Sequence, residues 1–310
     1  MKNKTLLGHL LAFITIFIWG TTFVSTKILL RDLSPIEILF YRFIIAYAIL
    51  WVIYPRFHKI KSAGEELLFL SLGLSGVTMY FLVENMALDY TYASNVGLIV
   101  SMSPISTAIA AHLFTRDEKF RPNLVWGFLM AISGIFLVVF NGRFVLKLNM
   151  AGDLLALLSA LTWTVYSVLL KKVDHSHSPL LVVRKTFFYG LLAITPMLFV
   201  FKADLKTAGA LSLTVALNVL FLGFAASALC FVMWNTTVRF IGTVKANNYI
   251  YLVPLITMVT SMLVLHEKVN WLMCLGGALI LSGVYVAEKG FRLPFSNRHR
   301  SDALNGSAGR

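Results

Sequence analysis

The chain is a series of long apolar runs separated by short polar segments, such as residues 31–34. Each run has close to the ~20 residues that cross a bilayer core as a helix. Helices are expected because lipid cannot satisfy open backbone groups, and the runs lack the alternation of barrel strands. The predicted spans are Gly8–Leu30, Pro35–Tyr54, Leu67–Leu88, Tyr92–Thr115, Leu124–Asn141, Gly152–Lys172, Leu180–Phe201, Leu211–Trp234, Thr243–Leu265 and Trp271–Glu288.

Composition agrees with a membrane protein. Apolar residues make up 58% of the 310 residues and charged residues only 13%, with a mean hydropathy of +0.79. A soluble domain carries about 25% charged residues, and a globular chain of this length cannot hide so much apolar surface from water. A soluble enzyme, a disordered chain and a disulfide scaffold are therefore excluded. Cys230 and Cys274 lie within apolar runs and are expected to be reduced thiols.

The net charge of +13 predicts an orientation in the membrane. In a soluble protein such an excess would suggest a nucleic-acid partner, which we do not expect here. With the N-terminus in the cytoplasm, 18 of the 27 Lys and Arg residues fall in cytoplasmic segments and 6 in outer segments. Because basic residues concentrate in cytoplasmic loops, both termini are predicted to be cytoplasmic.

The two halves of the chain resemble each other at an offset of 144 to 150 residues. Five spans in each half would place the second copy upside down relative to the first, which is an inverted repeat. We therefore expect an all-α integral membrane protein with ten transmembrane helices as two inverted five-helix repeats at 5–142 and 150–289, and a basic cytoplasmic tail at 290–310. The matched pairs include Gly8 with Gly152, Trp19 with Trp163, Lys27 with Lys171, Pro35 with Pro179, Asn85 with Asn235, Pro104 with Pro254, Glu118-Lys119 with Glu267-Lys268, and Ser133-Gly134 with Ser282-Gly283.

The same motifs resemble a known family, the EamA-type transporters of the drug/metabolite transporter superfamily. The resemblance covers about residues 5–289. It implies a multi-pass protein of the plasma (inner) membrane that exports amino acids or other metabolites. It also implies a cavity walled by the first, third, fourth, sixth, eighth and ninth spans. The residues that carry the resemblance are Trp19-Gly20, Pro35 with Arg42, Ala93-Ser94-Asn95 through Pro104 to Glu118-Lys119, and Pro254-Leu255 through His266-Glu267-Lys268 to Gly276-Gly277 and Ser282-Gly283.

Polar residues inside the spans are candidates for function because their burial in a bilayer is costly. Glu84 can take a proton or bind a substrate amine, or it can pair with Lys27 or Arg42 as a structural group. Arg42 can meet a substrate carboxylate or fix a contact between helices. Further candidates for the cavity are Asn85, Asn95, Asn235 and Asn248.

Aromatic residues in the middle of the spans have two interpretations. Trp19 and Trp163 are too deep for an interfacial belt, so they either wall a central site or pack in the core. The same alternatives hold for the hydroxyl-bearing side chains of Tyr80, Tyr166 and Tyr251.

Pro104 and Pro254 interrupt the fourth and ninth spans. Each frees a backbone carbonyl and permits a bend, so we expect them at a gate or cavity wall. Small residues four apart, Gly127 with Ala131 and Gly283 with Ala287, predict close helix contacts, either internal or at a dimer surface.

Motifs of other functions are missing from the sequence. Residues 266–270 begin like a zinc-protease motif but end in Asn270, and there is no phosphate-binding loop. We therefore expect no metal, no cofactor and no enzymatic activity. The leading hypothesis is a secondary transporter of small organic solutes that acts by alternating access, as a monomer or homodimer in the lipid bilayer. The alternative is a non-transport membrane protein, either a sensor or an intramembrane enzyme.

Overall fold

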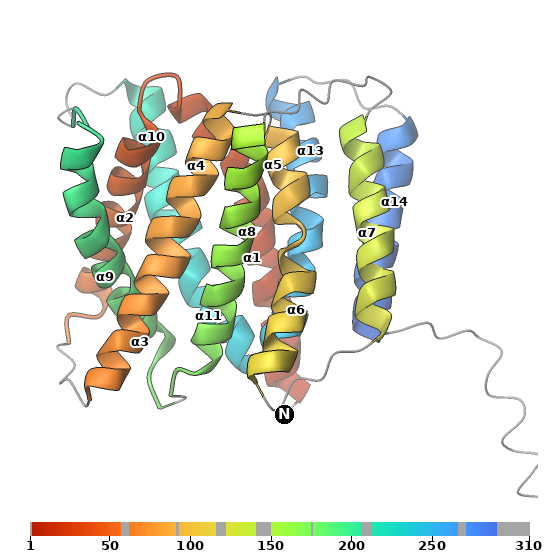
Figure 1. The fold of residues 1–310 in the computed structure, drawn as a ribbon, viewed down its shortest axis with the longest axis horizontal. Coiled ribbons are helices and arrows are strands. Elements are labelled where there is room, and N and C mark those ends of the chain that lie inside the picture. Colours follow the sequence, from red (N-terminus) through yellow and green to blue (C-terminus); the bar gives the residue numbers. More distant parts are fainter. Residues whose placement is uncertain are drawn as a thin grey trace, which may run out of the picture.

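The computed structural model describes residues 2–56, 62–90, 93–115, 122–140, 150–174, 176–205, 212–265 and 271–289. The predicted tail and the repeated Glu-Lys pairs lie outside these ranges. Within them every regular element is a helix, which confirms the all-α prediction (Figure 1). The elements are α1 (Lys2–Leu29), α2 (Pro35–Ile53), α3 (Ala63–Gly73), η1 (Leu74–Met79), α4 (Tyr80–Tyr90), α5 (Ala93–Val100), α6 (Ser103–Phe114), α7 (Pro122–Phe140), α8 (Met150–Lys171), α9 (Pro179–Val200), α10 (Leu213–Phe221), η3 (Leu222–Leu229), α11 (Cys230–Ile241), α12 (Thr243–Asn248), η4 (Tyr249–Leu252), α13 (Val253–Leu265) and α14 (Trp271–Lys289).

Six helical segments in the described ranges are long and apolar enough to cross a membrane. They coincide with the first three and the sixth to eighth predicted spans. The other four predicted spans fall on α5 with α6, on α7, on α12 to α13, and on α14, where Cys274–Ala287 is a shorter apolar helix. The six segments are Asn3–Leu29, Pro35–Ile53, Ala63–Tyr90, Met150–Lys171, Pro179–Val200 and Leu213–Ile241.

The helices stand side by side, so the bundle has two ends (Figure 1). We call the end at which α1 begins the N-terminal side, which is the lower end in Figure 1, and the other end the opposite side. Helices α2, α6, α8 and α11 end on the N-terminal side, whereas α4 ends on the opposite side.

Serine residues begin four of the long helical segments. The side chains of Ser62, Ser178 and Ser212 each accept a hydrogen bond from the backbone N–H three residues later, at 3.2–3.3 Å. At Ser34 the backbone N–H donates to Glu37 Oε2 at 2.8 Å. The carboxylate of the first helical turn therefore gives a hydrogen-bond partner to the backbone N–H of the residue before the helix. These local signals end the loops and fix where the apolar segments begin.

Two π-helical segments, η1 and η3, occupy corresponding places in the two halves. Each has a glycine at or next to its start, Gly73 directly before η1 and Gly223 as the second residue of η3, and each glycine contacts a neighbouring helix. A Cβ on Gly73 would lie 2.8 Å from the Thr186 carbonyl oxygen of α9, and one on Gly223 would lie 3.1 Å from the Arg42 carbonyl oxygen of α2. Glycine therefore lets the backbones approach closely at both places.

Helices α7 and α14 pack against each other through small residues. A Cβ on Gly127 would lie 2.5 Å from the Ala287 Cβ, and one on Gly283 would lie 2.6 Å from the Ala131 backbone nitrogen. The predicted small-residue contact is therefore present within the chain. In Figure 1 this pair stands at one edge of the bundle.

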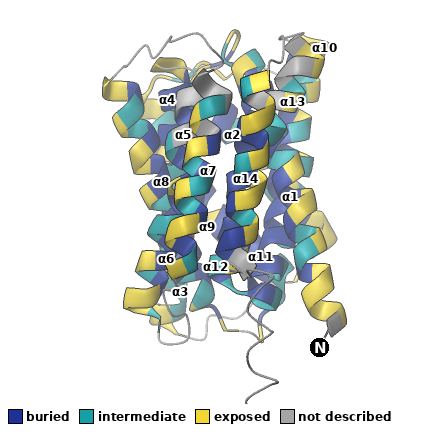
Figure 2. Ribbon diagram, turned by 90° about the vertical axis from the view of Figure 1, so that its right-hand side faces the viewer, coloured by how far each residue is buried: buried dark blue, intermediate teal, exposed yellow. Residues whose placement is uncertain are grey.

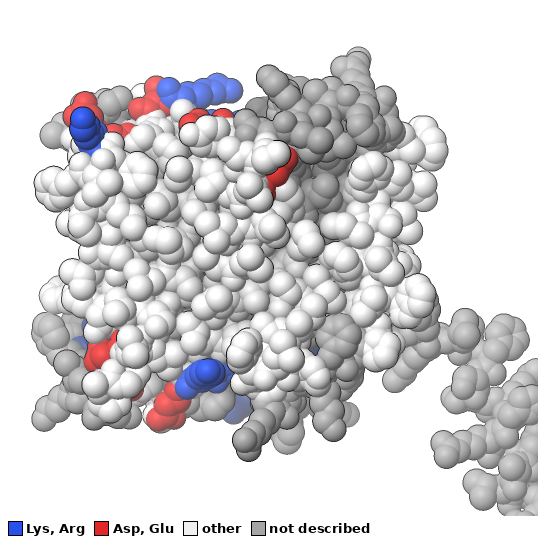
Figure 3. Space-filling model, viewed as in Figure 1, with Lys and Arg blue, Asp and Glu red and all other residues white. Residues whose placement is uncertain are grey.

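The surface of the bundle is apolar around its middle. Charged side chains gather near the two ends of the face shown in Figure 3, and the exposed positions of the helices lie on their outward faces (Figure 2). Large side chains such as Phe17, Phe188, Leu192 and Phe224 are about half exposed there. Lipid is the solvent that suits such a surface, so the chain is a multi-pass membrane protein.

Candidate functional site

A cavity lies between the helices in the middle of the bundle. About 560 Å³ of space between its walls is free of atoms, including open space at its mouth. Its wall comes from α1, α2, α4, α5, α6, α8, η4 and α13. The lining residues are Trp19, Thr22, Phe23, Arg42, Tyr80, Phe81, Glu84, Gly97, Val100, Ser101, Ser103, Trp163, Ile250 and Val253.

The wall differs in part from the one that the family resemblance implied. The first, third, fourth, sixth and ninth predicted spans contribute as expected. The second span also contributes, through Arg42, whereas none of the described residues of the eighth span lines the cavity. The eighth span lies behind the wall instead, where its Ser227 contacts Arg42.

Two opposite charges face this cavity. Arg42 from α2 and Glu84 from α4 are 3% and 7% exposed. Arg42 Nε donates to Ser227 Oγ at 2.6 Å, and the guanidinium carbon lies 4.1 Å from the centroid of the Phe81 ring. Glu84 Oε1 accepts a hydrogen bond from the Tyr80 hydroxyl at 2.9 Å. The arrangement can bind charged groups of a solute in a site shielded from water.

Glu84 does not hydrogen-bond to Lys27 or Arg42 among the described residues. Lys27 Nζ instead donates to the carbonyl oxygen of Leu88 at 2.7 Å. Arg42 and Glu84, both within the described part of the chain, line the cavity without an ion pair between them. Each side chain therefore remains in the cavity wall, where it can meet a solute.

Trp19 and Trp163 form one wall of the cavity. Their ring centroids lie 5.3 Å apart at an interplanar angle of 87°, a favourable edge-to-face geometry. Trp19 Nε1 donates to the Ala226 carbonyl oxygen at 2.8 Å, and Trp163 Nε1 donates to Asn247 Oδ1 at 3.0 Å. These bonds fix both indoles, so the wall is rigid.

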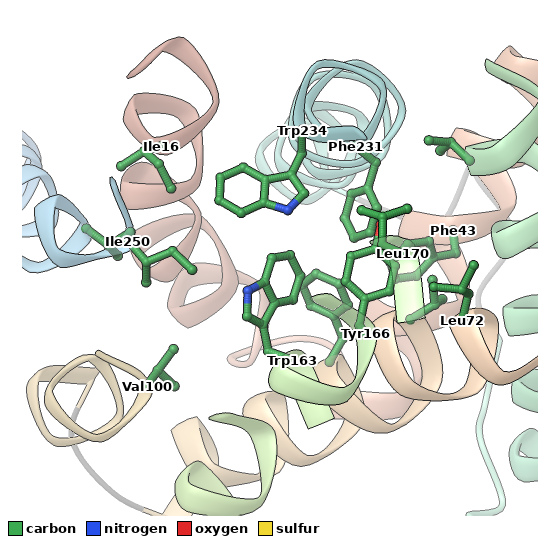
Figure 4. Close-up of a cluster of buried hydrophobic side chains, with 14 of the residues drawn as sticks. Ile16, Phe43, Leu72, Val100, Trp163, Tyr166, Leu170, Phe231, Trp234 and Ile250 are labelled. Atoms are coloured by element: carbon green, nitrogen blue, oxygen red, sulfur yellow. The ribbon is translucent and has the colours of Figure 1, made fainter. Parts of the chain in front are cut away.

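Trp163 also belongs to a packed cluster of buried aromatic side chains, here called the aromatic cluster, which includes Tyr166, Phe231 and Trp234 (Figure 4). Trp234 contacts Trp163 with a centroid distance of 5.8 Å, and Tyr166 contacts Phe231 at 6.0 Å. Tyr166 and Trp234 lie further along α8 and α11 toward the ends of these helices on the N-terminal side. The aromatic cluster therefore extends from the cavity wall toward that side of the bundle.

Several predicted site residues lie outside the cavity wall. Asn85 Nδ2 donates to the Pro35 carbonyl oxygen at 3.3 Å, which links α4 to α2. Asn235 Nδ2 donates to the Tyr166 hydroxyl at 3.1 Å, within the aromatic cluster. Asn248 is buried beside the cavity wall.

Two further predicted residues have other positions. Tyr251 is buried and packs near Phe128 of α7 with a centroid distance of 6.5 Å. Asn95 belongs to α5, but its side chain lies outside the described residues.

Pro104 and Pro254 both stand at the beginning of a helix. A turn at Ser101 and Met102 separates α5 from α6, which begins at Ser103. The short 3-10 segment η4 precedes α13, which begins at Val253. Both breaks lie next to the cavity, because Ser101, Ser103, Ile250 and Val253 line it.

The sequence places Asn247 at the start of the ninth span, where side chains can line a cavity, but it does not predict that Asn247 orients Trp163. Nor does it select Ser101 and Ser103 of the cavity wall. The two serines have a readable signal, because small hydroxyl residues directly precede Pro104. The contact of Asn247 with Trp163 has no signal in the sequence, since it joins residues 84 positions apart.

A polar network ties helices together at the N-terminal side. Glu65 of α3 pairs with His177, and Glu66 pairs with both Lys185 and Tyr189 of α9. Arg239 of α11 donates to the carbonyl oxygen of His177. We call these six residues the N-terminal-side network: Glu65, Glu66, His177, Lys185, Tyr189 and Arg239.

A group of three or more His, Cys, Asp or Glu side chains that could hold a metal ion is not present in the described part of the chain. Among the described residues that line the cavity, Glu84 carries the one carboxylate. Such a wall offers charge, hydrogen-bonding groups and aromatic surface to a solute.

The fold defines the class of the protein as a multi-pass helical membrane protein, and comparison with known proteins gives the family. Residues 6–140 and 150–288 both match the EamA-like transporter family. The chain belongs to this family, as the resemblance of its motifs predicted.

Curated relatives cover nearly the whole chain. An uncharacterized transporter of Archaeoglobus fulgidus is 29% identical over 92% of this chain and 98% of its own length. A probable amino-acid metabolite efflux pump of Escherichia coli is 25% identical over 91% and 95%, and one of Salmonella typhimurium is 24% identical over the same shares. A protein of known crystal structure, 20% identical, has the same fold with a TM-score of 0.75 over 92% of this chain and 99% of that one.

Proposed function

We propose that the chain is a secondary transporter that exports amino acids or related metabolites through the central cavity. The observation that carries the proposal is the cavity within the helical bundle, whose wall combines Arg42, Glu84 and two tryptophans. The names of the two distant efflux-pump relatives support the choice of solute. The same chemistry gives no support to a sensor or an intramembrane enzyme.

The proposal includes ten spans arranged as two inverted repeats at 5–142 and 150–289, followed by the tail at 290–310. Paired contacts between the halves support it. Gly73 meets Thr186, and the residues at matching positions of the other half, Gly223 and Arg42, also meet. Such reciprocal contacts are what a twofold axis in the membrane plane would produce.

We further propose that the protein lies in the plasma (inner) membrane with both termini in the cytoplasm, as its basic residues indicate. The N-terminal side would then be cytoplasmic. The N-terminal-side network and the aromatic cluster would then close the path from the cavity to the cytoplasm in this conformation. In alternating access both would have to separate so that the cavity opens inward.

Counterflow in proteoliposomes tests this function. Purified protein is reconstituted, loaded with one unlabelled solute and given the same labelled solute outside, for a panel of amino acids, nucleosides and polyamines. A pH gradient is applied in a parallel series. We expect saturable counterflow for members of the amino-acid group.

Two outcomes would contradict the proposal. Absence of counterflow for the whole panel would favour a non-transport protein, and flux without saturation would favour a channel. Glu84→Gln in the same assay should reduce counterflow, whereas Asp89→Asn, an exposed acid on the same helix, should not.

A further inference from the structure

The cavity wall places a cation and an anion beside an aromatic surface. Resting on the proposed function, we infer that the solute is a zwitterion with an apolar side chain. Arg42 binds its carboxylate, Glu84 binds its ammonium group, and Trp19 and Trp163 contact its side chain.

Arg42 is held so that part of its guanidinium remains available. Among the described residues its hydrogen bond runs from Nε to Ser227 Oγ, and its guanidinium carbon lies 4.1 Å from the centroid of the Phe81 ring. The two terminal amino groups of a guanidinium form a planar fork that matches a carboxylate. Because Arg42 lines the cavity, this fork can meet a carboxylate in it.

Glu84 is arranged in the same way. Tyr80 donates to Oε1, and within the described part of the chain Oε2 has no hydrogen bond. A carboxylate with one oxygen available can accept the N–H groups of an ammonium ion. The Tyr80 hydroxyl fixes the side chain, so the acceptor is oriented before the solute arrives.

The two charges lie close enough to act on one small solute. Phe81 and Glu84 are three residues apart in α4 and therefore share a helix face. The guanidinium of Arg42 rests on Phe81, which brings it within about one helical turn of Glu84. An α-amino acid carries its ammonium group and its carboxylate on the same carbon atom, which suits two opposite charges that lie close together.

Other solute classes fit the wall less well. A simple amine would leave Arg42 without a partner, a simple carboxylate would leave Glu84 without one, and an uncharged solute would satisfy neither. Each unpaired charge in a water-poor site is costly. The tryptophan pair favours an apolar or aromatic side chain over a charged one.

Calorimetric titration of the full chain in lipid nanodiscs tests this inference with three matched probes. L-phenylalanine carries both charges, 2-phenylethylamine lacks the carboxylate, and 3-phenylpropanoate lacks the ammonium group. We expect L-phenylalanine to bind about tenfold or more tightly than either analogue, which is the order expected for a charged hydrogen bond. Equal affinities of the three probes would overturn the inference.

Variants assign each charge to its group. Glu84→Gln should weaken L-phenylalanine binding about tenfold or more, yet leave 3-phenylpropanoate binding unchanged or tighter, because that probe has no ammonium group. Arg42→Lys should weaken L-phenylalanine and leave 2-phenylethylamine unchanged. Asp89→Asn and Arg31→Gln, both at exposed positions, are the matched controls. Equal losses for all three probes in either cavity variant would contradict the assignment.

The result is separable from the test of transport. If L-phenylalanine does not bind while another solute shows counterflow, the zwitterion site is wrong and the transporter stands. If L-phenylalanine binds with the expected selectivity but no solute shows counterflow, the site stands and transport is wrong. The measurements on the unsubstituted chain decide the first point even if a variant fails to fold.

Discussion

At the scale of single residues, the cavity depends on where neighbouring side chains point. Glu84 and Asn85 are consecutive and both are buried, but Glu84 lines the cavity and Asn85 bonds to the Pro35 carbonyl oxygen. Successive residues of a helix point about 100° apart, so only one of the two can face the cavity. The same logic separates Trp163, which lines the cavity, from Thr164, which bonds to Ser106 of α6.

Asn247 should stabilise the tryptophan wall through its bond to Trp163. We expect Asn247→Leu to lower the free energy of unfolding by about 1–3 kcal/mol, because the buried indole N–H loses its acceptor. Trp163→Phe should cost more, since it also removes ring contacts. The double variant should cost less than the sum of the two, by about 0.5–3 kcal/mol.

Unfolding in mixed detergent micelles measures the stabilities of the two single variants and the double variant. Ligand binding in nanodiscs then shows whether the tryptophan wall of the cavity still binds a solute. If the two substitutions were additive, the bond between Asn247 and Trp163 would have no energetic role.

At the scale of whole elements, helix contacts are set by small residues and helix breaks. α7 and α14 approach closely through Gly127 and Gly283, whereas the breaks before α6 and α13 shape the cavity wall. In a membrane the hydrophobic effect does little to join helices, because lipid tails are as apolar as leucine. Close packing of small residues therefore has to hold α7 to α14.

Gly127→Ala should destabilise the contact between α7 and α14. The added Cβ would lie 2.5 Å from the Ala287 Cβ and 2.6 Å from the Gly283 carbonyl oxygen, so the helices must move apart. We expect a loss of about 1–3 kcal/mol, typical of an overpacked site, even though alanine is the better helix former.

Gly64→Ala is the matched control for this substitution. A Cβ there would have its nearest contact at 4.0 Å, to Ser62 Oγ, so helix propensity alone should act and stability should hold or rise slightly. Thermal unfolding in detergent compares the two. Equal effects of both substitutions would contradict the packing argument.

At the scale of the whole molecule, the two halves differ at matching positions around the cavity. At the offset of 150 residues, Tyr80 matches Cys230, Phe81 matches Phe231, and Glu84 matches Trp234. The first member of each pair lines the cavity, and the second lies in or near the packed aromatic cluster. If the halves exchange conformations as inverted repeats do, the second members should line the cavity in the inward-open state.

Cys230 can report that exchange. It is fully buried in this conformation, so we expect slow reaction with a membrane-impermeant thiol reagent after the exposed Cys274 is replaced by serine. Lys185→Met breaks the pair with Glu66 in the N-terminal-side network and should favour the inward-open state. Labelling of Cys230 should then rise several-fold from the cytoplasmic face and not from the outer face.

Labelling in inside-out and right-side-out vesicles shows from which face of the membrane the reagent reaches Cys230. A rise from the outer face alone would contradict the proposed orientation, and no rise from either face would contradict the role of the network.

The candidate site could be predicted from the sequence only in part. Polar or aromatic residues deep in apolar runs are conspicuous, and Glu84, Arg42, Tyr80, Trp19 and Trp163 from that set line the cavity. The same signal also selects Asn235, Tyr166 and Tyr251, which are buried elsewhere. Depth in a span shows that a side chain needs a partner. It does not say whether the partner is a neighbouring helix or a solute.

By itself the sequence determined that the chain is a membrane protein, that it is helical and which family it belongs to. Lipid requires long apolar helices, and each helix is built from local contacts. The tertiary structure alone decided which sides of those helices meet. It brought Arg42 onto Phe81, Trp163 onto Asn247, and Glu65 and Glu66 onto the region around α9. These contacts join residues far apart in the chain. Their geometry depends on packing all the helices at once, so no local pattern could have specified it.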